Sequence, residues 1–143
     1  MNTCHFYIAE KTLPEDLLKT AAGIAAQIHR QHFRQEGRML VLCPDPEAFV
    51  REMWRVPGFI PSAAAGSPDA QAAPVVAAGN WCPGFGIILS LRPSLEHYAR
   101  EELDCALLAD FTLKSIPDLL PASRSRYRQL LTMGIRPENI SIS

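Results

Sequence analysis

The feature of this sequence that most constrains its fold is the alternation of short apolar runs with segments of helical periodicity. The runs "CHFYIA" (4–9) and "RMLVLC" (38–43) are rich in β-forming or apolar residues, as expected of buried strands. Between them, over 12–37, apolar residues recur at helical spacing, and a second helical segment follows over 45–54. Strand, helix, strand and helix in this order predict a right-handed crossover and a largely parallel sheet.

The rest of the chain continues this pattern. Further strands are expected at 74–79, 86–91 and 105–111. Two more helices are expected, one at 93–104 with Ser94 as its N-cap and one at roughly 118–133 that ends at Gly134. The intervening segment 62–74 has no apolar periodicity and is expected to be a flexible surface loop.

These elements predict one α/β domain over 1–143, with helices on both faces of the sheet and a Rossmann-like topology. No internal repeat or linker divides the chain, and its 143 residues are a common length for a single domain. No apolar run reaches the ~18 residues of a membrane span, and the first residues lack the features of a secretory signal. The expected location is therefore the cytoplasm.

The charge balance argues against a protein that coats nucleic acid. The formal net charge is -1, whereas such proteins carry a broad basic face that neutralises phosphates. Any contact with nucleic acid is therefore expected to be indirect.

The fingerprints of nucleotide-binding enzymes are missing from their usual places. The segment "EKTLPED" after the first strand contains no glycine, so neither a phosphate loop nor a dinucleotide fingerprint follows it. "PGFG" (83–86) precedes a strand and is read as a turn, and Ser90 lies outside any nucleophile elbow. No catalytic set is apparent, so the chain is expected not to be an enzyme and to need no cofactor.

Metal binding is not expected either. The four cysteines form no C-x-x-C pair and are read as structural. His29 and His32 could share one helix face, but two further ligands are missing and Arg30 and Arg34 beside them would repel a cation.

The aromatic segment "MWRVPGFIP" (53–61) permits two interpretations. Trp54, Val56, Phe59 and Ile60 could cover the core at the edge of the sheet. Alternatively, Trp54 and Phe59 could form a protein-binding edge, because aromatic side chains on a rigid turn make good interaction hot spots.

The segment "SRSRYRQLL" (123–131) concentrates arginines in a nearly neutral chain. Arg124 and Arg128 lie one helical turn apart, with Tyr127 between them, and Arg126 is expected to point away from the core. A helix here would bury a stripe made of Leu120, Ser123, Tyr127, Leu130, Leu131 and Gly134. The arginines could form a solvated basic face, or they could hold an anion such as a peptide carboxylate.

Taken together, the motifs resemble the chi subunit of bacterial DNA polymerase III holoenzyme over nearly the whole chain. The resemblance rests on a collinear series of motifs: "HFYI", "EGRMLVLCPD", "MW", "FIPS", "APVV", "ILSL" and "SRSRYRQLL…MGI". It implies a non-catalytic accessory subunit of the clamp-loader complex. Members of the family bridge the psi subunit to the acidic C-terminal tail of single-stranded DNA-binding protein, which ends in proline and phenylalanine.

By position, the resemblance implies that Arg124, Tyr127 and Arg128 bind this tail. It also implies that Trp54 and Phe59 lie at the psi-facing surface, which serves a helicase partner in some bacteria. Three positions depart from the pattern of the best-known members: Ser62 stands where a histidine is common, and two leucines stand where basic residues are found.
Leu120 and Leu131 stand where those members carry a lysine and an arginine.

Two rival functions remain open at this point. The chain could be a small enzyme or a phosphate-binding protein that uses Arg124 and Arg128 as an anion clamp at the carboxyl ends of the strands. It could also contact DNA directly, although the weak overall basicity disfavours this.

Overall fold

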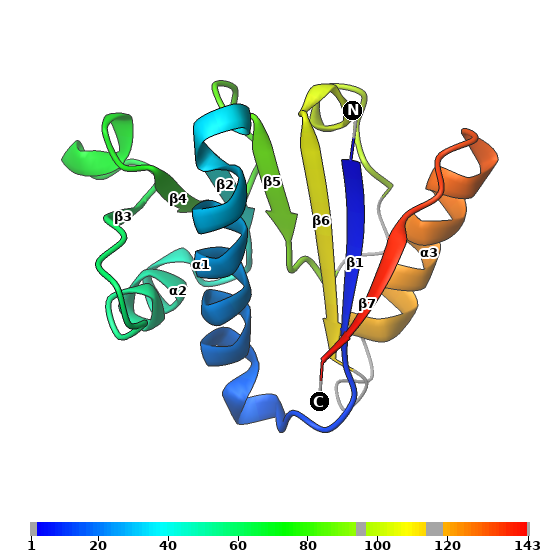
Figure 1. The fold of residues 1–143 in the computed structure, drawn as a ribbon, viewed down its shortest axis with the longest axis horizontal. Coiled ribbons are helices and arrows are strands. Elements are labelled where there is room, and N and C mark those ends of the chain that lie inside the picture. The colour runs from blue at the N-terminus through cyan, green and yellow to red at the C-terminus, as the bar shows by residue number, and fades with distance from the viewer. Residues whose placement is uncertain (1–2, 94–96, 114–118, 143) are drawn as a thin grey trace.

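The computed structural model describes residues 3–93, 97–113 and 119–142, and within them the chain forms one seven-stranded sheet. The strand order is β3-β4-β2-β5-β6-β1-β7, and every neighbouring pair is parallel (Figure 1). The strands are β1 (Thr3–Ala9), β2 (Met39–Leu42), β3 (Ser62–Ala64), β4 (Val75–Ala78), β5 (Ile87–Ser90), β6 (Leu107–Leu113) and β7 (Glu138–Ile142).

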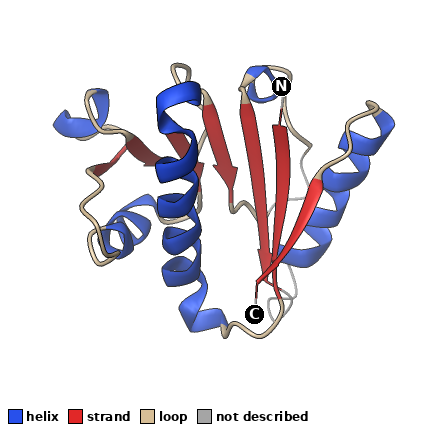
Figure 2. Cartoon of the chain, in the orientation of Figure 1, coloured by secondary structure: helices blue, strands red, loops and turns tan. Residues whose placement is uncertain are grey.

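Helices cover both faces of this sheet, as the sequence predicts (Figure 2). The α-helices are α1 (Leu17–Glu36), α2 (Pro46–Met53) and α3 (Leu119–Thr132), and the short 3-10 helices are η1 (Pro14–Asp16), η2 (Pro68–Gln71) and η3 (Glu102–Asp104). α1 and α2 pack on one face, whereas α3 packs on the other together with the segment around Tyr98. The architecture is a Rossmann-like α/β fold.

The central strands are mostly apolar because both of their faces are covered. In β2, Met39 and Val41 point to the side of α1, while Leu40 and Leu42 point to the side of α3. Every residue of β6 is buried as well. This double burial explains why these strands appear in the sequence as continuous apolar runs.

Local signals set the ends of the first two helices. Asp45 caps α2, since its carboxylate accepts a hydrogen bond from the backbone N–H of Ala48 at 3.1 Å. At the end of α1, Gly37 has a φ of 86°, which favours glycine, and its N–H donates to the carbonyl of Phe33.

The predicted helix at 93–104 is wrong for the residues that the structure describes there. Residues 97–99 have no regular structure, and only Glu102–Asp104 form a single 3-10 turn. The side chain of Gln129 on α3 replaces the helical hydrogen bonds at Tyr98: its oxygen accepts from the Tyr98 N–H at 2.7 Å and its nitrogen donates to the Tyr98 carbonyl at 3.0 Å. The proposed cap Ser94 lies outside the described residues.

Two strands are absent from the sequence prediction. Within 62–74, expected to be a loop, β3 pairs with β4 at one edge of the sheet and η2 follows it. At the opposite edge, β7 pairs with β1. β3 has only three residues, β7 is not buried at any position, and both form by pairing with residues distant in sequence, so the local pattern indicates them poorly. Among the described helices, none is long and apolar enough to cross a membrane.

We expect Gly86→Ala to lower the free energy of unfolding by at least about 1–3 kcal/mol, because an added methyl group would force the backbone to shift. A Cβ at Gly86 would lie 1.7 Å from the carbonyl oxygen of Glu36 at the end of α1. The matched control is Gly23→Ala in the middle of α1, where a Cβ would meet nothing within 4 Å. The control should gain up to about 1 kcal/mol from helix propensity. Urea denaturation measures both changes, and equal midpoints for the two variants would contradict this packing.

Candidate functional site

A pocket of about 340 Å³ lies between α3 and the strands beneath it. We call it the α3 pocket; its lining residues are Phe6, Ile8, Thr112, Leu120, Ser123, Arg124, Tyr127 and Asn139. Phe6 and Ile8 share one face of β1 because side chains alternate along a strand, and Thr112 lies beside Ile8 on β6. Most of the lining is apolar, which suits an apolar side chain.

Tyr127 forms one wall of this pocket. Its ring meets the ring of Phe6 edge to face, with centroids 5.0 Å apart and an interplanar angle of 87°. The amide nitrogen of Asn139 on β7 donates to the Tyr127 hydroxyl at 3.4 Å. The phenol ring is therefore held between β1 and β7.

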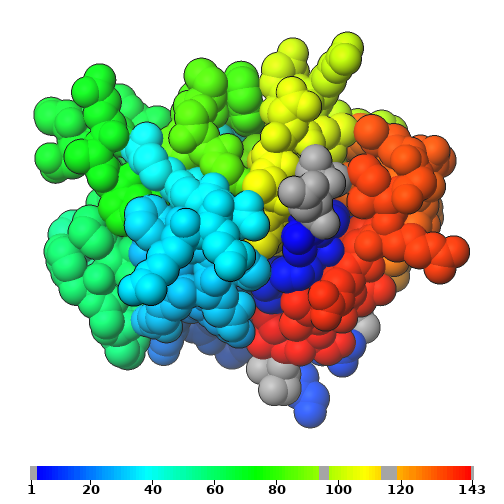
Figure 3. Space-filling model, turned by 45° about the horizontal axis from the view of Figure 1, so that its top comes forward, coloured from blue at the N-terminus to red at the C-terminus, as the bar shows by residue number. Residues whose placement is uncertain are grey.

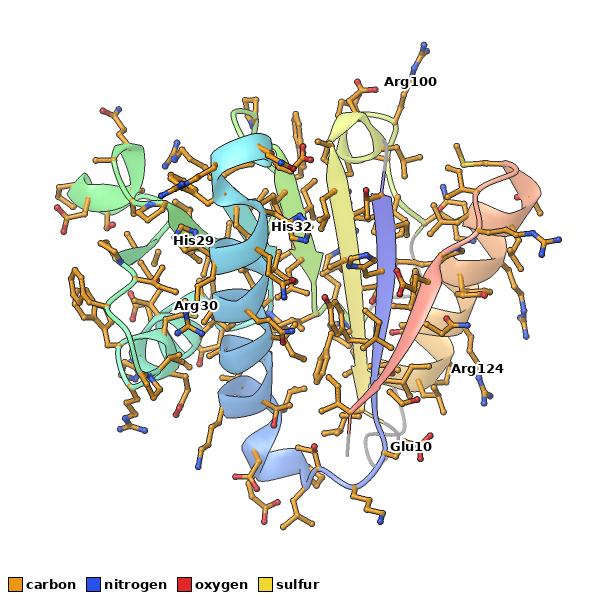
Figure 4. All side chains as sticks on the ribbon, viewed as in Figure 1. Glu10, His29, Arg30, His32, Arg100 and Arg124 are labelled. Carbon is orange, nitrogen blue, oxygen red and sulfur yellow. The ribbon has the colours of Figure 1, made fainter. Side chains whose placement is uncertain are left out.

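The structure brings Arg124 and Tyr127 together but leaves Arg128 outside the pocket. Arg124 is exposed and projects from α3 towards solvent (Figure 4). Successive helix residues are rotated by about 100°, so Arg128 lies about 40° further round α3 than Arg124. Both guanidinium groups are exposed, and neither forms an ion pair within the described part of the chain.

Arg126, expected to point away from the core, is instead fully buried at 0% exposure. Its Nε donates to Asp110 Oδ2 at 2.6 Å and its Nη2 donates to Asp110 Oδ1 at 3.2 Å. The same Nη2 also donates to the carbonyl of Arg92 at 2.9 Å. Asp110 lies in the middle of β6 and is itself fully buried, so charge pairing draws Arg126 into the core.

Further polar groups complete this buried network. The Tyr98 hydroxyl donates to Asp110, and the Ser123 hydroxyl donates to Asp110 Oδ1 at 3.3 Å. Beside it, Arg92 and Glu102 form two parallel hydrogen bonds of 3.1 and 2.6 Å. The network links β6, α3 and the segment before η3.

The protonation states of this network follow from its surroundings. Burial alone would lower the pKa of Arg126, but the charge and hydrogen bonds of Asp110 raise it above its ordinary value. Burial, followed by the charge of Asp110, raises the pKa of Tyr98 well above its usual range. Arg126 is thus a cation and Tyr98 a neutral donor, which makes the network structural rather than a store of mobile protons.

The aromatic edge consists of Trp54 and Phe59, and the structure exposes both rings. Trp54 is 55% exposed, Phe59 is 73% exposed, and their centroids are 5.2 Å apart. Ile60 is buried and belongs to the core. The core-covering interpretation of this segment therefore applies to Ile60, and the exposed Trp54 and Phe59 remain candidates for a protein-binding edge. Arg30 on α1 donates to the carbonyl of Pro57 and supports the turn between the two rings (Figure 4).

Sequence reasoning missed two features of the α3 region. An aspartate inside the apolar run "LLADFTL" signals a buried cation partner, and this signal was available. Thr112 gave no signal, because threonine is common in strands. Its hydroxyl is buried without a hydrogen-bond partner.

A second hollow, of about 650 Å³, lies between α1 and β7, where Figure 3 shows part of β1 between them. His5 and Tyr7 form part of its lining, but none of the predicted site residues does. In the part of the chain that the structure describes, no three metal-ligating side chains come together. The cysteines Cys4 and Cys43 are free, and burial raises the pKa of each thiol to about 12, so both are inert.

Comparisons with known proteins bear on the fold alone. No family model and no curated protein matches the sequence. Among solved structures, the chain is similar to the Hef helicase domain of Pyrococcus furiosus, with a TM-score of 0.53 and 14% identity. The similarity covers 98% of this chain but only 35% of the helicase-domain chain, so this protein spans about a third of that length. The likeness supports a Rossmann-like α/β domain.

We expect Asp110→Asn to lower the free energy of unfolding by about 3–5 kcal/mol, because it leaves the Arg126 cation buried without its counter-charge. Urea denaturation followed by circular dichroism measures the change. The matched control is Glu52→Gln, which removes a carboxylate paired with Arg55, whose side chain is 74% exposed. The control should lose no more than about 1 kcal/mol. An Asp110→Asn protein as stable as the wild type would show that the pair does not hold α3.

Proposed function

We propose that this protein is a non-catalytic scaffold of the bacterial replication machinery that binds the acidic C-terminal tail of single-stranded DNA-binding protein in the α3 pocket. The observation that carries the proposal is that Arg124 and Tyr127 border one apolar pocket on α3. A peptide that ends in an apolar residue offers both parts of the matching chemistry, an apolar side chain and a terminal carboxylate.

In the proposed complex, the last side chain of the tail enters the pocket against Phe6, Leu120 and Tyr127. The terminal carboxylate remains at the rim, where the Arg124 guanidinium can donate two parallel hydrogen bonds. The acidic residues that precede it follow α3 towards Arg128, one helical turn or about 6 Å further along.

The two departures on α3 take different places in this arrangement. Leu120 lines the pocket and adds apolar contact area in place of a charge. Leu131 is 45% exposed and offers no charge to the tail. The tail therefore depends on Arg124 and Arg128 for its electrostatic attraction.

The aromatic edge is proposed to dock the second partner, the psi subunit of the clamp-loader complex or, in some bacteria, a helicase. Exposed aromatic rings held on a supported turn favour a protein interface, because Trp and Phe bury a large apolar area without extensive loss of side-chain freedom. With one partner on each surface, the protein would tether the clamp loader to coated single-stranded DNA.

The rival enzyme or phosphate-binding function receives less support. A phosphate clamp needs several converging donors, whereas the α3 pocket is mostly apolar and Arg128 lies outside it.

We expect a peptide of the host's single-stranded DNA-binding protein tail to bind the full chain with micromolar affinity, measured by isothermal titration calorimetry. Arg124→Ala should weaken binding by about tenfold or more, since a charge-assisted hydrogen bond contributes about 1.5–3 kcal/mol. Arg128→Ala should weaken it less. Arg100→Ala is the matched control, because Arg100 is an exposed arginine at the top of the view in Figure 4, away from Arg124 at the lower right. Equal losses for Arg100→Ala and Arg124→Ala would indicate general attraction instead of a site.

We expect Trp54→Ala and Phe59→Ala each to weaken psi binding by tenfold or more while changing the free energy of unfolding by less than about 1 kcal/mol. Both rings lie largely in solvent, so the folded chain loses little when they are removed. Co-purification and calorimetry with the psi subunit measure the first effect, and thermal unfolding measures the second. Met133→Ala, at a residue 52% exposed beyond the end of α3, is the apolar control. Undiminished psi binding by both aromatic variants would refute this interface.

A further inference from the structure

One glycine within α1 is not explained by the folded chain. Gly23 is exposed, its φ is not positive, and a Cβ at this position would meet nothing within 4 Å. Glycine nevertheless destabilises a helix interior relative to alanine, because it loses more conformational freedom on folding. A helical glycine that neither the backbone nor its neighbours require favours close approach by another chain at this point.

Gly23 lies where two hollows beside α1 meet. The first is the hollow of about 650 Å³ between α1 and β7, which we call the β7 hollow. The second, of about 630 Å³, lies between α1 and the end of α2, and we call it the α2 hollow. Gly23 lines both, and α1 lies between α2 and β7 in Figure 1. The missing side chain therefore joins the two hollows across the exposed side of the helix.

The α2 hollow continues to the aromatic edge. Val56 and Pro57 line this hollow, and both lie in the turn between the exposed rings of Trp54 and Phe59. A partner that covers these rings therefore lies next to the path across Gly23.

The surface at Gly23 favours a helix as the occupant. The side of α1 offers no free backbone groups, so an extended chain crossing there would leave its own N–H and C=O groups without protein partners. A helix satisfies these groups internally, and it can approach α1 closely where no side chain separates the two backbones. Its side chains on either side of the crossing then enter the two hollows.

The β7 hollow suits an apolar side chain. Ile24 of α1 and Ile140 and Ile142 of β7 form the apolar part of its lining. Glu138 lies at its rim, 3.5 Å from His5 Nε2. Burial lowers the pKa of His5, so this imidazole is neutral at pH 7 and leaves the charge of Glu138 in place.

The α2 hollow suits a basic side chain. Glu15 and Asp16 line it, and neither forms an ion pair with another residue that the structure describes. Glu52 is already paired with Arg55 at 3.0 Å, which leaves Lys19 as the cation of the described lining without an ion pair. Carboxylates are thus in excess here, and a lysine or arginine complements them.

We propose that the two hollows, with Gly23 between them, hold an amphipathic helix of the partner that docks on the aromatic edge. This helix crosses α1 at Gly23 with a small residue at the contact. It places an apolar side chain in the β7 hollow and directs a lysine or arginine to Glu15 and Asp16 in the α2 hollow. The inference rests on the proposed function in that this partner is taken to be the psi subunit.

The test measures binding of the psi subunit to the full chain and its variants by isothermal titration calorimetry. Gly23→Gln should weaken binding by at least about tenfold, because a side chain at the crossing keeps the two helices apart. Gly79→Gln is the matched control, since Gly79 is also exposed, has room for a Cβ and lines neither hollow. The control should bind psi as the wild type does.

Thermal unfolding separates this role from a structural one. Gly23→Gln should unfold at the same temperature as the wild type or higher, because glutamine is the better helix former. A lower unfolding temperature would show that the fold needs the glycine, and would overturn the inference.

Two charge reversals test the basic side chain independently of Gly23. Glu15→Lys should weaken psi binding at low salt, whereas Lys19→Glu should strengthen it, because the first change removes negative charge from the α2 hollow and the second adds it. Loss of affinity in both variants, or in neither, would overturn the inference.

Trp54→Ala separates the inference from the proposed function. If Trp54→Ala weakens psi binding and Gly23→Gln does not, the inference fails while the aromatic edge remains an interface. If psi does not bind the wild type, the proposed docking role fails and the inference fails with it, whereas tail binding in the α3 pocket is decided by its own titration. Sedimentation of the protein alone tests a second copy as the occupant: a dimer that Gly23→Gln dissociates would overturn the inference.

Discussion

The position of the last helix depends on one buried ion pair, between Asp110 on β6 and Arg126 on α3. Both residues are fully buried, so separating them would leave a charge in an apolar core. The pair therefore fixes the rotation of α3 about its axis. With Arg126 directed at the sheet, helix geometry turns Arg124 and Arg128, two positions away on either side, towards solvent. The exposure of Arg124 and Arg128 thus follows from the burial of Arg126.

The same rotation forms the α3 pocket. Ser123 and Tyr127 fall on one flank of α3, between the buried Arg126 and the exposed Arg124, and line the pocket together with Phe6 and Ile8 of β1. The hydroxyl of Ser123 turns inward to Asp110, so the network that holds the helix also supports one wall of the pocket. The pocket and the core are joined through a few polar contacts.

Parts of this site follow from the sequence and parts do not. The grouping of Arg124 with Tyr127 follows from helical spacing, and the apolar segment around Trp54 was recognisable as a candidate interface. The inward position of Arg126 was not predicted, since the arginine and its partner Asp110 are 16 positions apart and no local pattern links them. The exposure of Trp54 and the burial of Ile60, in one short segment, depend on how α1 and α2 support that turn.

The sequence by itself determined the order of the five central strands and the three α-helices, the parallel sheet and the two-sided core, because hydrophobic periodicity and cap residues act over a few neighbours. Only the tertiary structure decided the features that need partners distant in sequence. The edge strands β3 and β7 exist through pairing with β4 and β1, and the segment at Tyr98 leaves the helical path because Gln129 satisfies its backbone. The carboxylate of Asp110, distant in sequence, likewise decided that Arg126 is the buried arginine. A charge in the core needs an opposite charge beside it, and Asp110 provides that charge.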